Sequence, residues 1–296
     1  VSMGIKAGTP LLFAVVGEIL TERSGVLNLG LEGLMLMGAV TGFSVAHATG
    51  NKWLAILAVL AISALLGLIL AVLMVTFKAN QIATGIAATI FLTGLSTLIG
   101  KPVLGVLAGD RFRKISIPFL VKVPLLQMLF EKDILVYIAL IICALAFFLL
   151  YRTKAGLHLR AAGDSPATLD SLGVSVVRIR YLCVIIGSML TGVGGAYLSL
   201  AYTPTWIEGM AAGRGWLTIA LVNFALWNPG KAVYGAFLFG IFYALSFRIE
   251  AMGIAVPSYF LRMIPYVLPI IILISVSYTH LRAHETSLHL VCRLLL

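Results

Sequence analysis

Long apolar runs alternate with short polar connections along the whole chain, and this pattern decides its class. A helix that spans a bilayer needs about 20 mainly apolar residues. By that measure the sequence predicts nine membrane-spanning helices, near residues 5–21, 25–46, 53–77, 82–100, 133–151, 181–202, 211–227, 231–248 and 258–276. The alternating segments of about ten residues that build membrane β-barrels are not seen. The expected fold class is therefore an all-α polytopic membrane protein.

Composition supports this class and argues against nucleic acid as a partner. Hydrophobic residues make up 61% and charged residues 11% of the 296 positions, whereas soluble domains have about 45–50% and about 25%. The formal net charge is +10, but the basic residues stand in short connections between apolar runs. Basic connections of this kind are typical of segments that border a membrane, so membrane lipid is the expected contact.

The charges also bear on which side of the membrane each connection occupies. The connection 152–180 carries five Arg and Lys residues against two Asp residues, and the positive-inside rule predicts that it is cytoplasmic. Alternation of spans then places Arg23, Lys78 and Lys231 on the same side. It also places the connection 101–132 outside, although that connection is basic too. The two basic connections therefore cannot both obey the positive-inside rule.

One short segment of the connection 152–180 has the signals of a separate helix. Ser165 suits an N-cap and Pro166 the first helical position, while Gly173 suits a position of positive φ beyond the helix end. Leu169 and Leu172 are expected on one side of the helix. It either rests on its own bundle or docks into a groove on a soluble partner. The candidate docking residues are Gly163, Asp164, Ser165, Pro166, Ala167, Thr168, Leu169, Asp170, Leu172 and Gly173.

Polar residues inside the predicted spans are candidates for function, because they are costly at membrane depth. Asn28 and Glu32 are four residues apart and are expected on one helix face, near glycines that permit local unwinding. They are predicted to form a clamp between helices or to line a transport path. The candidates for the path are Asn28, Glu32, Asn80, Gln81 and Asn223. Gly187, Thr191 and Gly195 form a seam of small residues suited to close helix packing.

Several kinds of chemistry lack their sequence motifs. There is no phosphate-binding loop, no zinc motif and no metal-ligand spacing among the three cysteines. We expect no metal, no cofactor and no enzymatic activity in this chain. Residues 1–276 are expected to form the transmembrane domain, with a clipped first helix. The character changes at about residue 277, and 277–296 are expected to be a non-native tail.

The stretch Thr9–Leu12 followed by Glu22–Gly33 closely resembles permease subunits of bacterial ABC importers. Within that family it is most similar to the nucleoside and simple-sugar branch, which is related to branched-chain amino acid permeases. Further matches are Asn80-Gln81, Gly156 with Arg160–Gly163, Gly209-Met210 with Ala212–Gly215, and Trp227–Pro229. The chain departs from the pattern at Ala225-Leu226, where the family usually has two glycines.

The resemblance implies a subunit that carries nucleosides or related simple sugars across the bacterial cytoplasmic membrane. Ribose-like sugars and branched-chain amino acids are alternative solutes. Gly163–Gly173 would be the coupling helix seated on ABC ATPase subunits, which would supply the ATP hydrolysis. A second permease subunit and an extracellular substrate-binding lipoprotein would complete the importer. The residues alone leave open an ion-coupled secondary transporter in which Glu18 or Glu32 carries a proton, and, less well supported, a membrane enzyme.

Overall fold

The chain is a bundle of α-helices in the computed structural model, which describes residues 2–106, 112, 114–115, 132–252 and five positions between 257 and 267. Seven helices of the described part are long and apolar enough to cross a membrane. They are α1 (Ser2–Arg23), α2 (Leu31–Thr49), α3 (Lys52–Ala71, extended by the π-helical turn η1, Val72–Thr76), α4 (Gln81–Gly100), α6 (Ile134–Arg152), α9 (Val176–Tyr197, extended by the π-helical turn η3, Leu198–Tyr202) and α11 (Pro229–Ala251).

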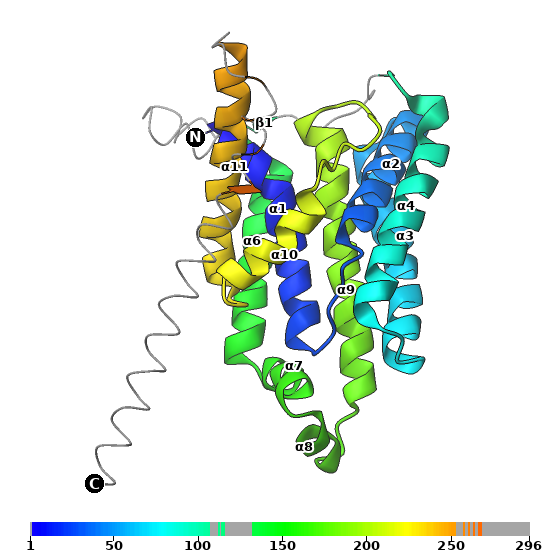
Figure 1. Cartoon of the computed structure of the whole chain (residues 1–296), viewed down its shortest axis with the longest axis vertical. Coiled ribbons are helices and arrows are strands. Elements are labelled where there is room, and N and C mark those ends of the chain that lie inside the picture. Colours follow the sequence, from blue (N-terminus) through cyan, green and yellow to red (C-terminus); the bar gives the residue numbers. More distant parts are fainter. Residues whose placement is uncertain are drawn as a thin grey trace, which may run out of the picture.

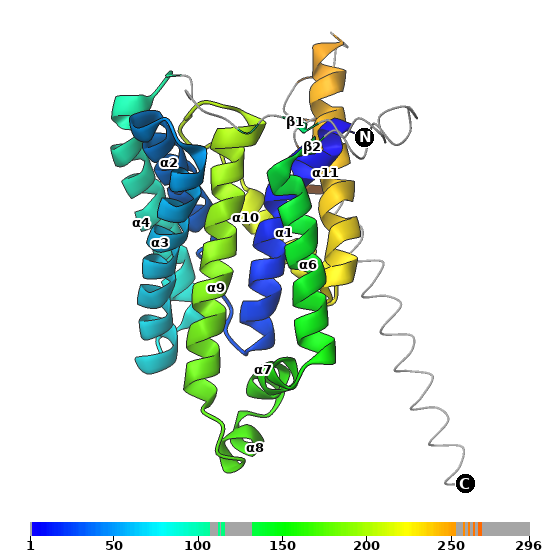
Figure 2. The same ribbon diagram turned by 180° about the vertical axis from the view of Figure 1, so that it is seen from behind.

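Two short helices, α7 (Lys154–Asp164) and α8 (Pro166–Ser171), lie together at one end of the bundle. The C-terminal ends of α1, α3 and α6 reach this same end, and α4, α9 and α11 start from it (Figures 1 and 2). The sequence prediction that Arg23, Lys78 and Lys231 share a side with the connection 152–180 agrees with this course of the chain.

The prediction of nine spanning helices is not confirmed. The predicted span 211–227 is wrong: it contains α10 (Arg214–Phe224), which has only 11 residues. At 1.5 Å per residue such a helix is about 16 Å long, roughly half of the hydrocarbon core of a bilayer. The predicted span 258–276 lies almost wholly outside the described residues, and the tail 277–296 lies entirely outside them.

Asparagine side chains set the starts of three helices. Asn51 and Asn80 each accept hydrogen bonds from two backbone amides at the beginning of α3 and α4. Asn228 accepts from one amide, that of Gly230, at the beginning of α11, and Pro229 follows it at the first helical position. These side chains satisfy amides that have no partner within the helix, so the helices begin within two residues of their predicted starts.

Small residues allow α1, α2 and α9 to pack with their backbones in contact. A Cβ atom on Gly17 of α1 would lie 2.6 Å from the carbonyl oxygen of Gly187 in α9. A Cβ atom on Gly38 of α2 would lie 2.0 Å from the carbonyl oxygen of Gly192. The predicted seam on α9 is confirmed, since Gly187, Thr191 and Gly195 are all buried. Close backbone contact of this kind is how helices associate in lipid.

The bundle end opposite α7 and α8 carries a two-stranded antiparallel ribbon of β1 (Lys114–Ile115) and β2 (Lys132–Asp133). A short 3₁₀ turn, η2 (Lys101–Val103), follows α4 at this end. Asp133 is fully buried and pairs with the Nζ atom of Lys6 at 3.0 Å, which ties the ribbon to α1. The rest of the connection 101–132 is mostly outside the described residues.

Candidate functional site

The chain between α1 and α2 is broken, and polar side chains hold the break in place. Gly25 has φ +88°, a conformation that favours glycine. The Asn28 amide donates to Glu18 Oε1 at 3.0 Å, and Asn28 Oδ1 accepts from the Gly30 amide at 2.9 Å. The predicted helix 25–46 therefore begins only at Leu31. Asn28 and Glu32 do not share a helix face, because Asn28 lies in the broken segment, residues 24–30.

Glu32 joins the start of α2 to the start of α10. Its Oε1 accepts from the Gly213 amide at 2.8 Å and its Oε2 from the Gly215 amide at 2.7 Å. Amides in the first turn of a helix lack partners within the helix and carry partial positive charge. A carboxylate across them is a strong clamp. This geometry favours the clamp interpretation of Glu32 over a direct role as solute ligand or proton carrier.

The other three path candidates differ in what they contact. Gln81 Oε1 accepts from the Leu27 amide at 2.8 Å, so Gln81 also holds the broken segment. Asn80 is exposed and its side chain caps α4. Asn223 donates to the Ile219 carbonyl of its own helix at 3.1 Å. The structure thus places Asn28, Glu32 and Gln81 in the broken segment or next to it. Among the residues that the structure describes, Asn80 and Asn223 bond only to backbone groups of their own helices.

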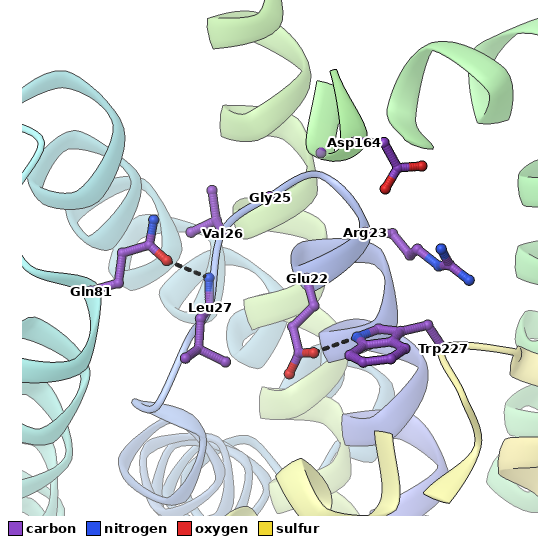
Figure 3. A pocket seen from close by; sticks show the side chains of 9 residues that line it. Glu22, Arg23, Gly25, Val26, Leu27, Gln81, Asp164 and Trp227 are labelled. Atoms are coloured by element: carbon purple, nitrogen blue, oxygen red, sulfur yellow. Dashed lines mark hydrogen bonds between the residues drawn. The ribbon is translucent and has the colours of Figure 1, made fainter. Parts of the chain in front are cut away.

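A pocket of about 350 Å³ lies beside the broken segment, at the end of the bundle where α7 and α8 stand. In Figure 3 Glu22 points toward Trp227, and Gln81 reaches the Leu27 backbone from the other side. The indole Nε1 of Trp227 donates to Glu22 Oε2. The pocket is lined by Glu22, Arg23, Gly25, Val26, Leu27, Gln81, Gly163, Asp164 and Trp227.

Two contacts attach the α7 end directly to the broken segment. Arg180 of α9 donates from Nε to the Ser24 carbonyl at 3.1 Å and from Nη2 to the Ala162 carbonyl at 3.0 Å. Gly163 lies against the chain just after α1, where an added Cβ atom would be 2.4 Å from the Arg23 carbonyl oxygen. The end of α7 and Arg180 of α9 are therefore in direct contact with the end of α1 and the broken segment.

The short helix α8 confirms part of its prediction and corrects part of it. It begins at Pro166, and Gly173 has φ +76°. Gly163 and Asp164, however, belong to α7, and Ser165 bonds the Thr168 hydroxyl rather than the helix backbone. Leu169 and Leu172 are not equivalent: Leu169 is 2% exposed and anchors the helix, whereas Leu172 is 72% exposed. Leu172 follows the last helical residue, Ser171, and does not pack against the bundle as Leu169 does.

Comparison with known proteins shows the family of this chain. The family model described as the permease component of the branched-chain amino acid transport system matches residues 1–275. The chain belongs to this permease family. It is a membrane-spanning permease subunit of an ABC importer, which works with separate ATPase and substrate-binding components. The alternative of an ion-coupled transporter loses its support, because ATP hydrolysis on another subunit supplies the energy.

Three relatives show how closely the chain follows the family. It is 41% identical over 257 residues to TsgC13 of Haloferax volcanii, a permease protein of an ABC transporter provisionally assigned to glucose, covering 85% of this chain and 78% of the relative. It is 32% identical to the guanosine ABC transporter permease protein NupQ of Bacillus subtilis, covering 89% and 87%. It is also 32% identical to the nucleoside ABC transporter permease protein NupC of Lactococcus lactis, covering 90% and 88%.

Sequence reasoning missed several residues that hold the permease together at this site. In sequence Arg180 is one charge of the basic connection 152–180 and Trp227 is part of a family match, yet both bond groups near the end of α1. Glu18 was considered only as a proton carrier, yet it binds the Asn28 amide. One signal was available: Glu18 and Glu22 are four residues apart and so share a helix face toward the break.

Proposed function

We propose that this permease imports nucleosides or related sugar-containing solutes across the cytoplasmic membrane. Support comes from the relatives, whose names give guanosine, nucleosides and glucose as the solutes of their systems. In this proposal the chain pairs with a second, similar permease subunit. Two ABC ATPase subunits bind the cytoplasmic end, and a substrate-binding lipoprotein delivers the solute from outside.

The coupling segment in this proposal is Gly163–Gly173, at the end of the bundle that carries α7 and α8. The supporting observation is that α8 projects from the bundle (Figure 1) with only Leu169 of its six residues buried, while α7 is attached to the broken segment by Arg180 and Gly163. An isolated helix this short is unstable, so its exposed surface is suited to being held by a partner. ATP-driven closure of the ATPases would move α8, and α7 would transmit the movement.

The proposed path runs along the broken segment and the start of α10. Asn28, Glu32 and Gln81 act there as clamps that set the shape of the segment, since their side-chain oxygens accept bonds from backbone amides. Asn80 and Asn223 remain candidates for lining the path. A half-length helix with its start held at a carboxylate resembles the broken helices of other transporters, where such starts lie near the solute.

The test replaces Leu172 with Asp, because this side chain is exposed and the bundle does not depend on it. Leu172→Asp is expected to lower ATPase co-purification with the permease and solute-stimulated ATP hydrolysis by about 30-fold, since a hot-spot contact contributes about 2 kcal/mol. The matched control is Met252→Asp, an apolar residue of similar exposure (70%) just after the end of α11. It should leave both quantities unchanged.

The outcome of this pair of variants is decisive for the coupling segment. Wild-type ATPase association and stimulation in Leu172→Asp would contradict the docking role of α8. A loss of the same size in Met252→Asp would show that a new charge merely disturbs membrane insertion. Guanosine and glucose uptake by the unmodified importer, measured in reconstituted vesicles with ATP, tests the proposed solute class separately.

A further inference from the structure

A second pocket, of about 260 Å³, lies in the half of the bundle farther from α7 and α8. It is enclosed by η3, the connection that follows it, the start of α10 and one side of α11. Its lining combines three aromatic rings with charged groups, contributed by Tyr202, Glu208, Met210, Arg214, Tyr243 and Phe247. Its volume is close to the lower limit of ligand pockets, about 300 Å³, so it is suited to a small solute.

Arg214 is the unusual member of this pocket. It is only 4% exposed, and among the described residues no carboxylate forms an ion pair with it. Its guanidinium lies over the Tyr243 ring at 4.4 Å and over the Tyr202 ring at 5.7 Å. Charged residues at membrane depth are costly and are retained mainly where they serve a function. Two ring faces offset part of that cost.

Among the described residues, the hydrogen bonds of Arg214 leave one edge of the guanidinium for a ligand. In the described part of the chain they run from Nη1 alone, to the carbonyls of Met210 and Ala211 at 3.0 and 3.1 Å. A guanidinium has five N–H donors, so those on Nε and Nη2 remain. Tyr202 is the last residue of the π-helical turn η3, and such turns are frequent at functional sites.

We propose, building on the proposed function, that this pocket receives one neutral ring of the solute, the sugar or the base of a nucleoside. Phe247 offers a ring face on which the solute ring stacks, and Tyr243 contacts that ring with the side that Arg214 leaves uncovered. The N–H groups on Nε and Nη2 of Arg214 donate to the oxygen or nitrogen acceptors of the solute ring. Stacking of a base on an aromatic side chain contributes about 1–3 kcal/mol. A neutral ring suits the pocket because two backbone carbonyls and two tyrosine rings already stabilise the positive charge of Arg214. The cation therefore does not need an anionic ligand.

The pocket is also connected to the clamp at the start of α10. Arg214 stands between Gly213 and Gly215, the two residues whose amides bind the Glu32 carboxylate. A solute that pulls on the Arg214 side chain therefore acts on the same turn that Glu32 holds. This places the proposed solute contact directly between the two amides that Glu32, at the start of α2, holds.

The experiment measures occupancy of the pocket directly, without transport. Ile207 lines the pocket and is 53% exposed, so Ile207→Cys introduces a thiol at its mouth. Cys143 and Cys183 are buried, and Cys292→Ser removes the remaining cysteine. In the assembled importer, guanosine or glucose should slow labelling of the new thiol by a water-soluble maleimide. The control Tyr234→Cys, on an exposed position of α11 that does not line the pocket, should be labelled at an unchanged rate.

A second substitution tests the ring contact. Tyr243→Leu in the Ile207→Cys background should raise the half-protecting concentration by about tenfold, the equivalent of a contact of about 1.4 kcal/mol. Tyr234→Leu should not change it. Protection by leucine instead, absence of protection by any of these solutes, or equal shifts in the two tyrosine variants would overturn the proposal. Guanosine or glucose uptake could persist in each of these cases, so the proposed function would stand or fall on its own assay.

Discussion

The helices α1 and α3 are both membrane spans, yet the less apolar of the two is the one in the centre. The spanning window of α1 has a mean hydropathy of 1.5 and is 89% buried, whereas that of α3 has 3.0 and is 33% buried. Lipid tails are as apolar as leucine side chains, so apolarity does not drive a helix into the bundle interior. Small residues and polar bonds do, and α1 carries Gly17, Glu18 and Thr21 where α3 has mostly leucine, isoleucine and alanine.

The largest effect should come from filling the backbone contact between α1 and α9. Gly17→Leu would place a side chain against the Gly187 carbonyl, which cannot move aside as a flexible side chain can. We expect the free energy of unfolding to fall by about 3 kcal/mol, measured by thermal unfolding in detergent. Gly94→Leu on α4, where nothing lies within 4 Å of the added Cβ, is the control. Equal stability of the two variants would contradict the claim that close backbone contact holds α1 in the centre of the bundle.

A smaller effect should come from the clamp that polar bonds provide. Glu32→Ala removes the acceptors of two amides at the start of α10 and should lower stability by about 2 kcal/mol, because hydrogen bonds to charged groups contribute about 1.5–3 kcal/mol. Glu32→Gln keeps one oxygen acceptor and should fall between the wild type and Glu32→Ala. Unfolding and ATP-driven uptake are the two measurements. Full uptake with wild-type stability in Glu32→Ala would show that α10 is held by other contacts.

The smallest effect should come from the apolar face of α3. Leu65 is 53% exposed, and Leu65→Ala exchanges one lipid contact for another. The isolated permease should therefore lose no more than about 0.5 kcal/mol of stability. A larger loss of stability that appears only in the assembled importer would identify this face of α3 as a contact with the second permease rather than with lipid.

Much of the fold could be predicted from the sequence because its signals are local. The spans α3, α4, α6, α9 and α11 are apolar runs of sufficient length, and asparagine caps and prolines mark several of their starts. The boundaries of α8 follow in the same way from Pro166 and Gly173. Family membership was also within reach, because the Glu22–Gly33 string is a continuous motif.

Tertiary contacts alone decided where the helices break and which side chains are free. Residues 25–30 and 211–213 belong to apolar stretches, so hydropathy extended helices through both. Whether the backbone stays helical there depends on partners distant in the sequence: Glu18 and Gln81 hold the first break, and Glu32 holds the start of α10. In the same way Leu169 and Leu172 look alike in sequence, and only packing against the bundle buries one and exposes the other. Local pattern determines which segments enter the membrane, and hydrogen bonds across the bundle determine where they must leave the helix.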